Sequence, residues 1–180
     1  MITRTLVLVF LLGLPGVALT QTLSAAVSSS EQKLPVGLLS PFLTEKLLPP
    51  SVLYKGQQAP VQGRNSGAIR YADGTLVIAS LVDSSGYSTG IREKYQFFLY
   101  TERSLSFGEK ILAPGFYGAG FLANNTLVIT DVSGRDLITT PTTTDAGFKR
   151  PRPLQILASP DGSEFRLYLG RSFVALPAAK

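Results

Sequence analysis

Residues 110–130 read KILAPGFYGAGFLANNTLVIT, which predicts a turn, a strand, a tight turn and a second strand. Pro114 and Gly115 favour the first turn, because proline fixes its own φ and glycine accepts a positive φ. Phe116 to Leu122 is an extended run, and Ala123-Asn124-Asn125 offers the left-handed backbone conformations that a hairpin needs. The β-branched, apolar run that follows completes the hairpin.

Similar segments recur along the chain. Asp73-Gly74 predicts a two-residue turn that leads into a central strand from Thr75 to Val82. Ser159-Pro160-Asp161-Gly162 predicts another turn, which separates strands at Leu154–Ala158 and Glu164–Leu169. We count roughly seven to nine short strands joined by turns, a pattern typical of antiparallel β-proteins.

The predicted fold is therefore all-β: a small antiparallel barrel, with a β-sandwich as the alternative. Gly118 and Gly120 favour a closed barrel, because they share one face of a strand where the sheet can bend or a neighbour can approach closely. A short helix is predicted from Pro41 to Leu48, with Ser40 as its N-cap, and the alternative is a proline-rich arm on the surface.

The segments between these elements give further expectations. Residues Lys55 to Gly67 and Asp83 to Gly90 are rich in glycine and polar side chains and predict loops. An aromatic strand is expected from Lys94 to Thr101, followed by a connection from Glu102 to Lys110.

The first residues predict an export signal. Arg4 is followed by an apolar run from Leu6 to Leu14, and small residues end at Ala26. The expected organisation is a cleaved signal peptide at residues 1–26, a Ser/Pro-rich lead with the short helix at 27–50, and one antiparallel β-domain at 51–180. The protein is expected to be secreted or periplasmic, with no membrane span after cleavage; an uncleaved membrane anchor is the alternative.

The composition excludes several kinds of chemistry. The sequence contains no cysteine, histidine or tryptophan, so it lacks the usual ligands of zinc, copper and haem, and no cofactor or metal site is expected. Catalysis by Ser-His-Asp or Cys-His groups is excluded within this chain. The net charge is +5 and the charges are scattered, so nucleic acid is not an expected partner.

Acidic and basic side chains give no clear catalytic pattern. Most carboxylates fall in predicted turns, where aspartate caps the backbone, although Asp131 and Asp136 flank one turn and could approach each other. The densest basic run, Lys149-Arg150-Pro151-Arg152-Pro153, is interpreted as a solvated loop, with an anionic polymer or membrane surface as the alternative partner.

The aromatic residues are the candidates for ligand binding. Tyr95, Phe97 and Leu99 are expected to share one face of their strand. Core packing is the simpler interpretation, and the alternative is an aromatic-lined cavity for an apolar ligand or a sugar. The residues singled out for such a cavity are Tyr95, Phe97, Phe116 and Phe121.

One segment resembles a known pattern. Gly108-Glu-Lys-Ile-Leu-Ala-Pro-Gly-Phe-Tyr117, between an aromatic strand and a hairpin, resembles a turn found in small exported bacterial β-barrel-like proteins that are uncharacterised. The resemblance spans about Tyr95 to Val174, with Ala113-Pro114-Gly115 in place of the Pro-Ala-Gly order. It implies a fold and export but assigns no residue roles.

The function predicted from the sequence is binding rather than catalysis. We expect an exported, non-enzymatic β-domain whose partner is a small apolar ligand or an envelope protein. A structural or assembly role in the cell envelope is the alternative, and a carboxylate-dependent hydrolase is less favoured.

Overall fold

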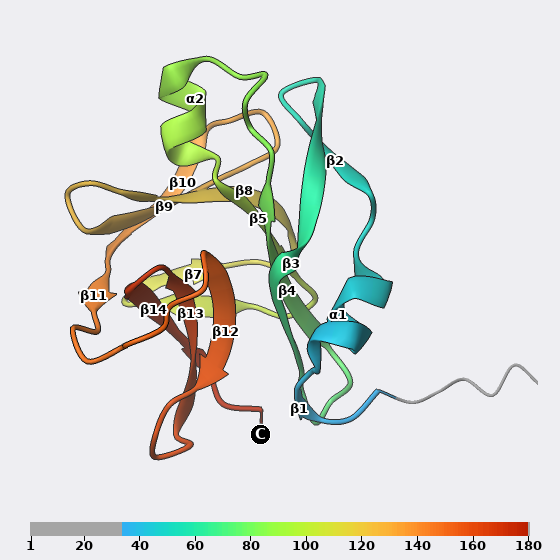
Figure 1. Ribbon diagram of the computed structural model, residues 1–180, viewed down its shortest axis with the longest axis vertical. Coiled ribbons are helices and arrows are strands. Elements are labelled where there is room, and N and C mark those ends of the chain that lie inside the picture. Colours follow the sequence, from blue (N-terminus) through green and yellow to red (C-terminus); the bar gives the residue numbers. More distant parts are fainter. Residues whose placement is uncertain (1–33, 180) are drawn as a thin grey trace, which may run out of the picture. The chain divides into compact units, whose positions relative to one another are not determined.

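The computed structural model describes residues 34–179, and antiparallel strands make up most of this part of the chain (Figure 1). The elements, in chain order, are β1 (Gly37–Leu38), α1 (Pro41–Leu47), β2 (Ser51–Tyr54), β3 (Gln57–Arg70), β4 (Leu76–Val82), α2 (Thr89–Lys94), β5 (Phe97–Thr101), β6 (Leu105–Phe107), β7 (Lys110–Leu112), β8 (Gly115–Leu122), β9 (Thr126–Thr130), β10 (Asp136–Pro141), β11 (Thr143–Thr144), β12 (Leu154–Ala158), β13 (Glu164–Leu169) and β14 (Ser172–Pro177). The predicted signal peptide lies outside the described residues.

Three antiparallel sheets contain these strands. The largest has eight strands in the order β1-β3-β4-β5-β8-β9-β10, with β2 also paired to β3. The second has four strands in the order β11-β14-β13-β12, and the third is the β6–β7 hairpin. The prediction of a central buried strand after Asp73-Gly74 is confirmed, because β4 lies between β3 and β5 and is buried along most of its length.

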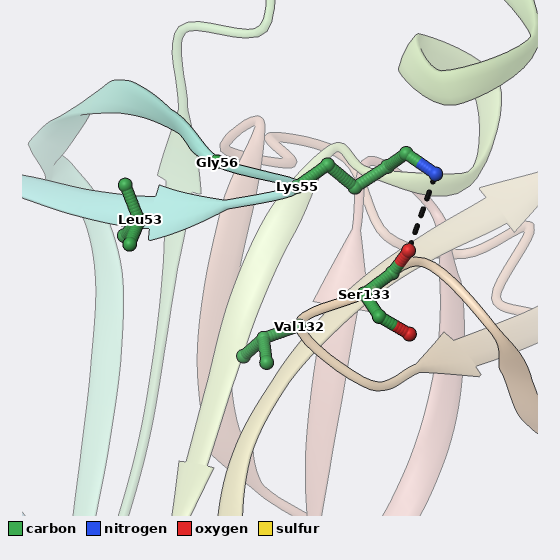
Figure 2. A pocket seen from close by; sticks show the side chains of 5 residues that line it. All are labelled: Leu53, Lys55, Gly56, Val132 and Ser133. Carbon is green, nitrogen blue, oxygen red and sulfur yellow. Dashed lines mark hydrogen bonds between the residues drawn. The ribbon is translucent and has the colours of Figure 1, made fainter.

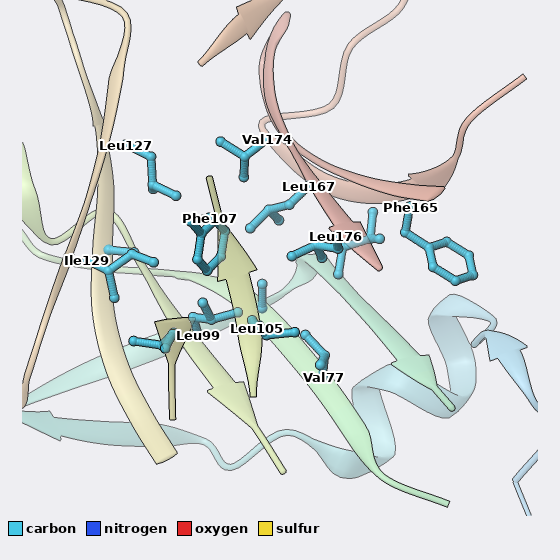
Figure 3. Close-up of a cluster of buried hydrophobic side chains, with 14 of the residues drawn as sticks. Val77, Leu99, Leu105, Phe107, Leu127, Ile129, Phe165, Leu167, Val174 and Leu176 are labelled. Carbon is cyan, nitrogen blue, oxygen red and sulfur yellow. The ribbon is translucent and has the colours of Figure 1, made fainter. Parts of the chain in front are cut away.

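None of the sheets of residues 34–179 closes into a barrel, so the predicted barrel is wrong and the alternative, a sandwich, describes the fold. A single hydrophobic cluster joins the large sheet, the small sheet and the β6–β7 hairpin (Figure 3). Its fully buried side chains include Leu99 and Ile129 from the large sheet, Leu105 from the hairpin and Leu167 from the small sheet. Closure is unnecessary because the second layer covers this face of the large sheet.

A second cluster covers the opposite face of the large sheet. It includes side chains of β2, the helix α1 and the segment around α2. Helix α1 confirms the predicted short helix: the Ser40 hydroxyl accepts a hydrogen bond from the Leu43 N–H, as an N-cap does.

The two glycines of β8 explain how β2 and α2 pack closely on this face of the large sheet. A Cβ at Gly118 would lie 2.5 Å from the Tyr54 ring and 2.8 Å from the Tyr95 ring, and one at Gly120 would lie 2.6 Å from the Glu93 carbonyl oxygen in α2. The prediction that neighbours approach these glycines closely is confirmed. They serve the contact with β2 and α2, not the closure of a barrel.

The turns before and within the β8–β9 hairpin match the prediction only in part. Asn125 adopts a left-handed conformation with φ of 58°, as a tight hairpin turn requires. Gly115 does not have a positive φ; it begins β8 instead. A Cβ there would lie 2.8 Å from the Tyr117 hydroxyl oxygen, and that hydroxyl donates a hydrogen bond to the Ala113 carbonyl. Glycine at 115 therefore makes room for a side chain.

Two of the expected connections and the start of one expected strand are wrong. The predicted loop at Lys55–Gly67 is most of strand β3, and β2 and β3 meet in a two-residue turn at Lys55 and Gly56, whose φ angles are 48° and 76°. The predicted strand from Lys94 begins only at Phe97, because α2 occupies the preceding residues. The connection after β5 contains β6. Among the described residues, no helix is long and apolar enough to cross a membrane.

Candidate functional site

The four aromatic residues singled out from the sequence lie on opposite faces of the large sheet. Tyr95 and Phe116 belong to the cluster under α1 and α2, whereas Phe97 and Phe121 pack with the core between the sheets. Phe97 and Phe121 meet edge to face with their ring centroids 6.0 Å apart. The four residues therefore do not line one common cavity.

Tyr95 does not share a face with Phe97 and Leu99, contrary to the prediction. The alternation of a strand begins only at Phe97, because α2 ends at Lys94 and Tyr95 is its C-cap, with φ of −122° and ψ of 82°. The bend at this cap turns the Tyr95 ring to the other side of the sheet, where it stacks on Tyr54 with a centroid separation of 3.7 Å.

The tyrosines of this second cluster have a packing role. Tyr54 and the Thr130 hydroxyl share a hydrogen bond of 2.7 Å, and the Tyr87 hydroxyl donates to the backbone carbonyls of Tyr54 and Gln57. Burial raises the pKa of both Tyr54 and Tyr95 above the ordinary value for tyrosine. These rings fasten β2 and α2 to the large sheet.

The carboxylates mostly serve their own turns. Asp73, Asp83, Asp131 and Asp161 each accept a hydrogen bond from a backbone N–H two residues later, which confirms the interpretation of turn capping. Asp131 also pairs with Arg135, while Asp136 pairs with the Lys94 ammonium at 2.6 Å.

The two carboxylates that flank one turn therefore have separate partners. Within residues 34–179, no three or more acidic side chains gather as a metal site would require. Lys149, Arg150 and Arg152 are exposed in the loop before β12.

An apolar groove lies where the β2–β3 turn meets the β9–β10 turn (Figure 2). We call it the β2 groove; its volume is about 460 Å³, and its lining residues are Leu53, Lys55, Gly56, Val132 and Ser133. Leu53 is 61% exposed and Val132 is 49% exposed, so two large apolar side chains face solvent beside each other. Lys55 joins the two turns, because its N–H donates to the Val132 carbonyl at 2.9 Å and its ammonium to the Ser133 carbonyl at 3.2 Å.

The β2 groove borders an unpaired strand edge. Strand β2 pairs only with β3 among the strands of residues 34–179. The Val61 N–H donates to the Pro50 carbonyl. The backbone N–H and C=O groups of every second residue from Pro50 along β2 therefore point towards β3. By the same alternation, the backbone groups of Ser51 and Leu53 point away from β3.

A larger cleft lies at the end of the β8–β9 hairpin. We call it the end cleft; its volume is about 760 Å³, and its lining residues are Glu93, Gln96, Phe121, Leu122, Ala123, Asn124, Asn125, Leu169 and Ser172. It is open to solvent and combines one aromatic ring with amide, hydroxyl and carboxylate groups. Of the four candidate aromatic residues, Phe121 is the one that lines it.

Sequence reasoning found only Phe121 among the residues of these two surfaces. The sequence does not indicate the β2 groove, because its composition predicts a loop at Lys55. A lysine-glycine pair between two runs that can form strands is the signal that could have revealed this turn.

No family model, curated protein or solved structure matches this chain. The resemblance to small exported bacterial proteins therefore stays a prediction. The candidate sites depend on geometry alone.

Proposed function

We propose that this protein is an exported, non-enzymatic β-sandwich that binds a protein of the cell envelope through the β2 groove. The bound segment is extended and adds a strand to the free edge of β2. An apolar side chain of that segment packs against Leu53 and Val132.

The observation that carries the proposal is the unpaired edge at Leu53 beside two exposed apolar side chains. Outward N–H and C=O groups on a strand edge are a template for another strand. The edge gives affinity through backbone hydrogen bonds, and the apolar pair adds side-chain selectivity. Lys55 holds the two turns together by its two hydrogen bonds, so the surface is ordered before a partner arrives.

The packing of the aromatic side chains supports a surface contact over an internal apolar ligand. Tyr95 and Phe97 are fully buried in two separate clusters, and both rings pack against other aromatic side chains. Side chains that fill a core do not line a cavity for a ligand.

The test is site-specific photocrosslinking of the full chain in its native cells. A benzophenone amino acid replaces Leu53 in one variant and Ile111 in a control, since Ile111 is 71% exposed on the β6–β7 hairpin. We expect one discrete envelope protein to be crosslinked from position 53, and the crosslink to be lost when Val132→Asp is added. Equal crosslinking from position 111, or none from position 53, would refute the proposal.

Export is tested separately by determining the first residue of the protein purified from the same cells. We expect the chain to begin near residue 27. A chain that retains residues 1–26 would contradict the predicted cleavage.

A further inference from the structure

We propose that the end cleft is a second binding site and that it takes a neutral oligosaccharide. Its volume of about 760 Å³ lies within the range of about 300–1,000 Å³ that small-molecule sites occupy. This site is independent of the β2 groove, with which it shares no lining residue.

Phe121 forms a rigid wall of the end cleft. The Gln96 side chain binds the backbone of Phe121 twice: its Oε1 accepts from the Phe121 N–H at 3.0 Å, and its Nε2 donates to the Phe121 carbonyl at 3.2 Å. The Phe97 ring meets the Phe121 ring edge to face. An aromatic ring fixed in this way is a platform for the apolar C–H face of a sugar ring.

Polar groups surround this ring with unused hydrogen-bonding capacity. The side chains of Glu93, Asn125 and Ser172 line the cleft and form no hydrogen bond or ion pair with other described residues. Asn124 accepts a hydrogen bond from the Thr126 hydroxyl through Oδ1, which leaves its two N–H donors for a ligand. Together these groups supply both donors and acceptors, as sugar hydroxyls require.

The charge of the lining selects among ligands. Within residues 34–179, no lysine or arginine lines the end cleft, and Glu93 brings a negative charge, so phosphorylated and carboxylated sugars are repelled. Of the cations adjacent in sequence to lining residues, Lys94 pairs with Asp136 and Arg171 donates to the Phe148 carbonyl. An apolar ligand is disfavoured because it would strip water from the amides and the carboxylate without replacing their hydrogen bonds.

The test uses saturation-transfer NMR and calorimetry on the full chain with defined sugars. The neutral probes are maltotriose and the trimer of N-acetylglucosamine, and the anionic probe is trigalacturonate. We expect saturable binding of at least one neutral probe and none of the anionic probe. Stronger binding of trigalacturonate, or no saturable binding of either neutral trimer, would overturn the proposal.

Variants place the binding in the end cleft. Phe121→Leu and Glu93→Gln should each weaken binding roughly tenfold, the effect of losing about 1.4 kcal/mol of contact. Matched controls are Phe42→Leu, an exposed ring on α1, and Glu109→Gln, an exposed carboxylate in the β6–β7 turn.

The controls should bind as the unchanged protein does. The urea midpoint of each variant shows whether it folds. If Phe121→Leu fails to fold, Glu93→Gln still tests the site, because it changes only an exposed side chain. Unchanged affinity in Glu93→Gln would overturn the placement of the sugar in this cleft.

Discussion

Replacing Gly118 by alanine should destabilise the protein through a clash with the tyrosine rings that cover the outer face of the large sheet, opposite the small sheet. The new Cβ would lie 2.5 Å from Tyr54, 2.8 Å from Tyr95 and 2.9 Å from the Thr130 hydroxyl. The two rings cannot both move away, because they stack on each other at 3.7 Å and both are almost completely buried.

The magnitude follows from two terms. Overpacking a well-filled core costs about 1–3 kcal/mol. A shift of Tyr54 would also disturb its buried hydrogen bond to Thr130, which is worth about 0.5–1.5 kcal/mol. We expect a loss of about 2–4 kcal/mol in the free energy of unfolding, a large share of the stability of a domain of this size.

Urea unfolding followed by circular dichroism measures this loss. With a slope of about 2 kcal/mol per molar urea, the midpoint should fall by about 1–2 M. The matched control is Gly90→Ala in α2, where a Cβ would meet nothing within 4 Å and the stability should be unchanged or higher by up to about 1 kcal/mol.

A double variant isolates the clash. If the ring of Tyr54 is the obstacle, Gly118→Ala should cost less in a Tyr54→Leu background than in the unchanged protein. Equal costs in the two backgrounds, or a loss below about 0.5 kcal/mol for the single variant, would refute this account of Gly118.

Two further predictions concern the core and a turn. Leu105→Ala should lower the free energy of unfolding by about 2–5 kcal/mol, because Leu105 is fully buried between the sheets. Ile111→Ala on the same hairpin should change it by less than about 0.5 kcal/mol, because Ile111 is exposed. Urea midpoints measure both variants, and similar losses would contradict the assignment of the core. Hydrogen bonds lower the pKa of Asp131 to about 2, and the one from the Ser133 hydroxyl has the largest effect. The ionised Asp131 carboxylate therefore stabilises the fold above about pH 4, and this stabilisation is lost as the pH falls towards 2. Asp131→Asn should therefore flatten the acid side of the melting temperature against pH, and an unchanged profile would show that this carboxylate does not stabilise the turn.

Strands are best predicted from the sequence where a run of strand-forming residues is bounded by turn residues next to it in the chain. The bounds of β12 and β13 match the expected ones, because a Ser-Pro-Asp-Gly turn separates two runs of strand-forming residues. In β13, the alternating apolar residues Phe165 and Leu167 enter the core between the sheets. Such elements need no information from distant parts of the chain.

Most of strand β3, from Gln57 to Gly67, forms where the sequence predicts a loop, because its pairing partners override its composition. Gly67 is needed in this strand because it lies against the small sheet. A Cβ at this position would lie 2.8 Å from the Ile156 nitrogen of β12, so glycine allows the two sheets to approach. Helix α2 was missed for a related reason: it is short, and it rests against Gly120 of β8. Both elements exist through contacts between distant segments, which no local pattern records.

The candidate sites were difficult to predict for the same reason. The β2 groove combines two turns that are far apart in the sequence, and the end cleft combines β8, α2 and the small sheet. Phe121 was recognisable as an aromatic residue but its polar neighbours were not, because asparagines in a turn already have a conformational role.

The margins of the large sheet explain why strand addition is proposed at β2 rather than elsewhere. At the other margin, the Thr142 N–H donates to the Asn125 carbonyl, so the alternation turns Pro141 of β10 outward, and proline has no N–H to offer a partner. A register shift beside Leu137 interrupts the same strand. Strand β1 is only two residues long. At β2, Leu53 has an outward N–H and an outward C=O beside an apolar surface. Of the margins at β10, β1 and β2, only β2 therefore offers an added strand both hydrogen bonds and buried apolar area.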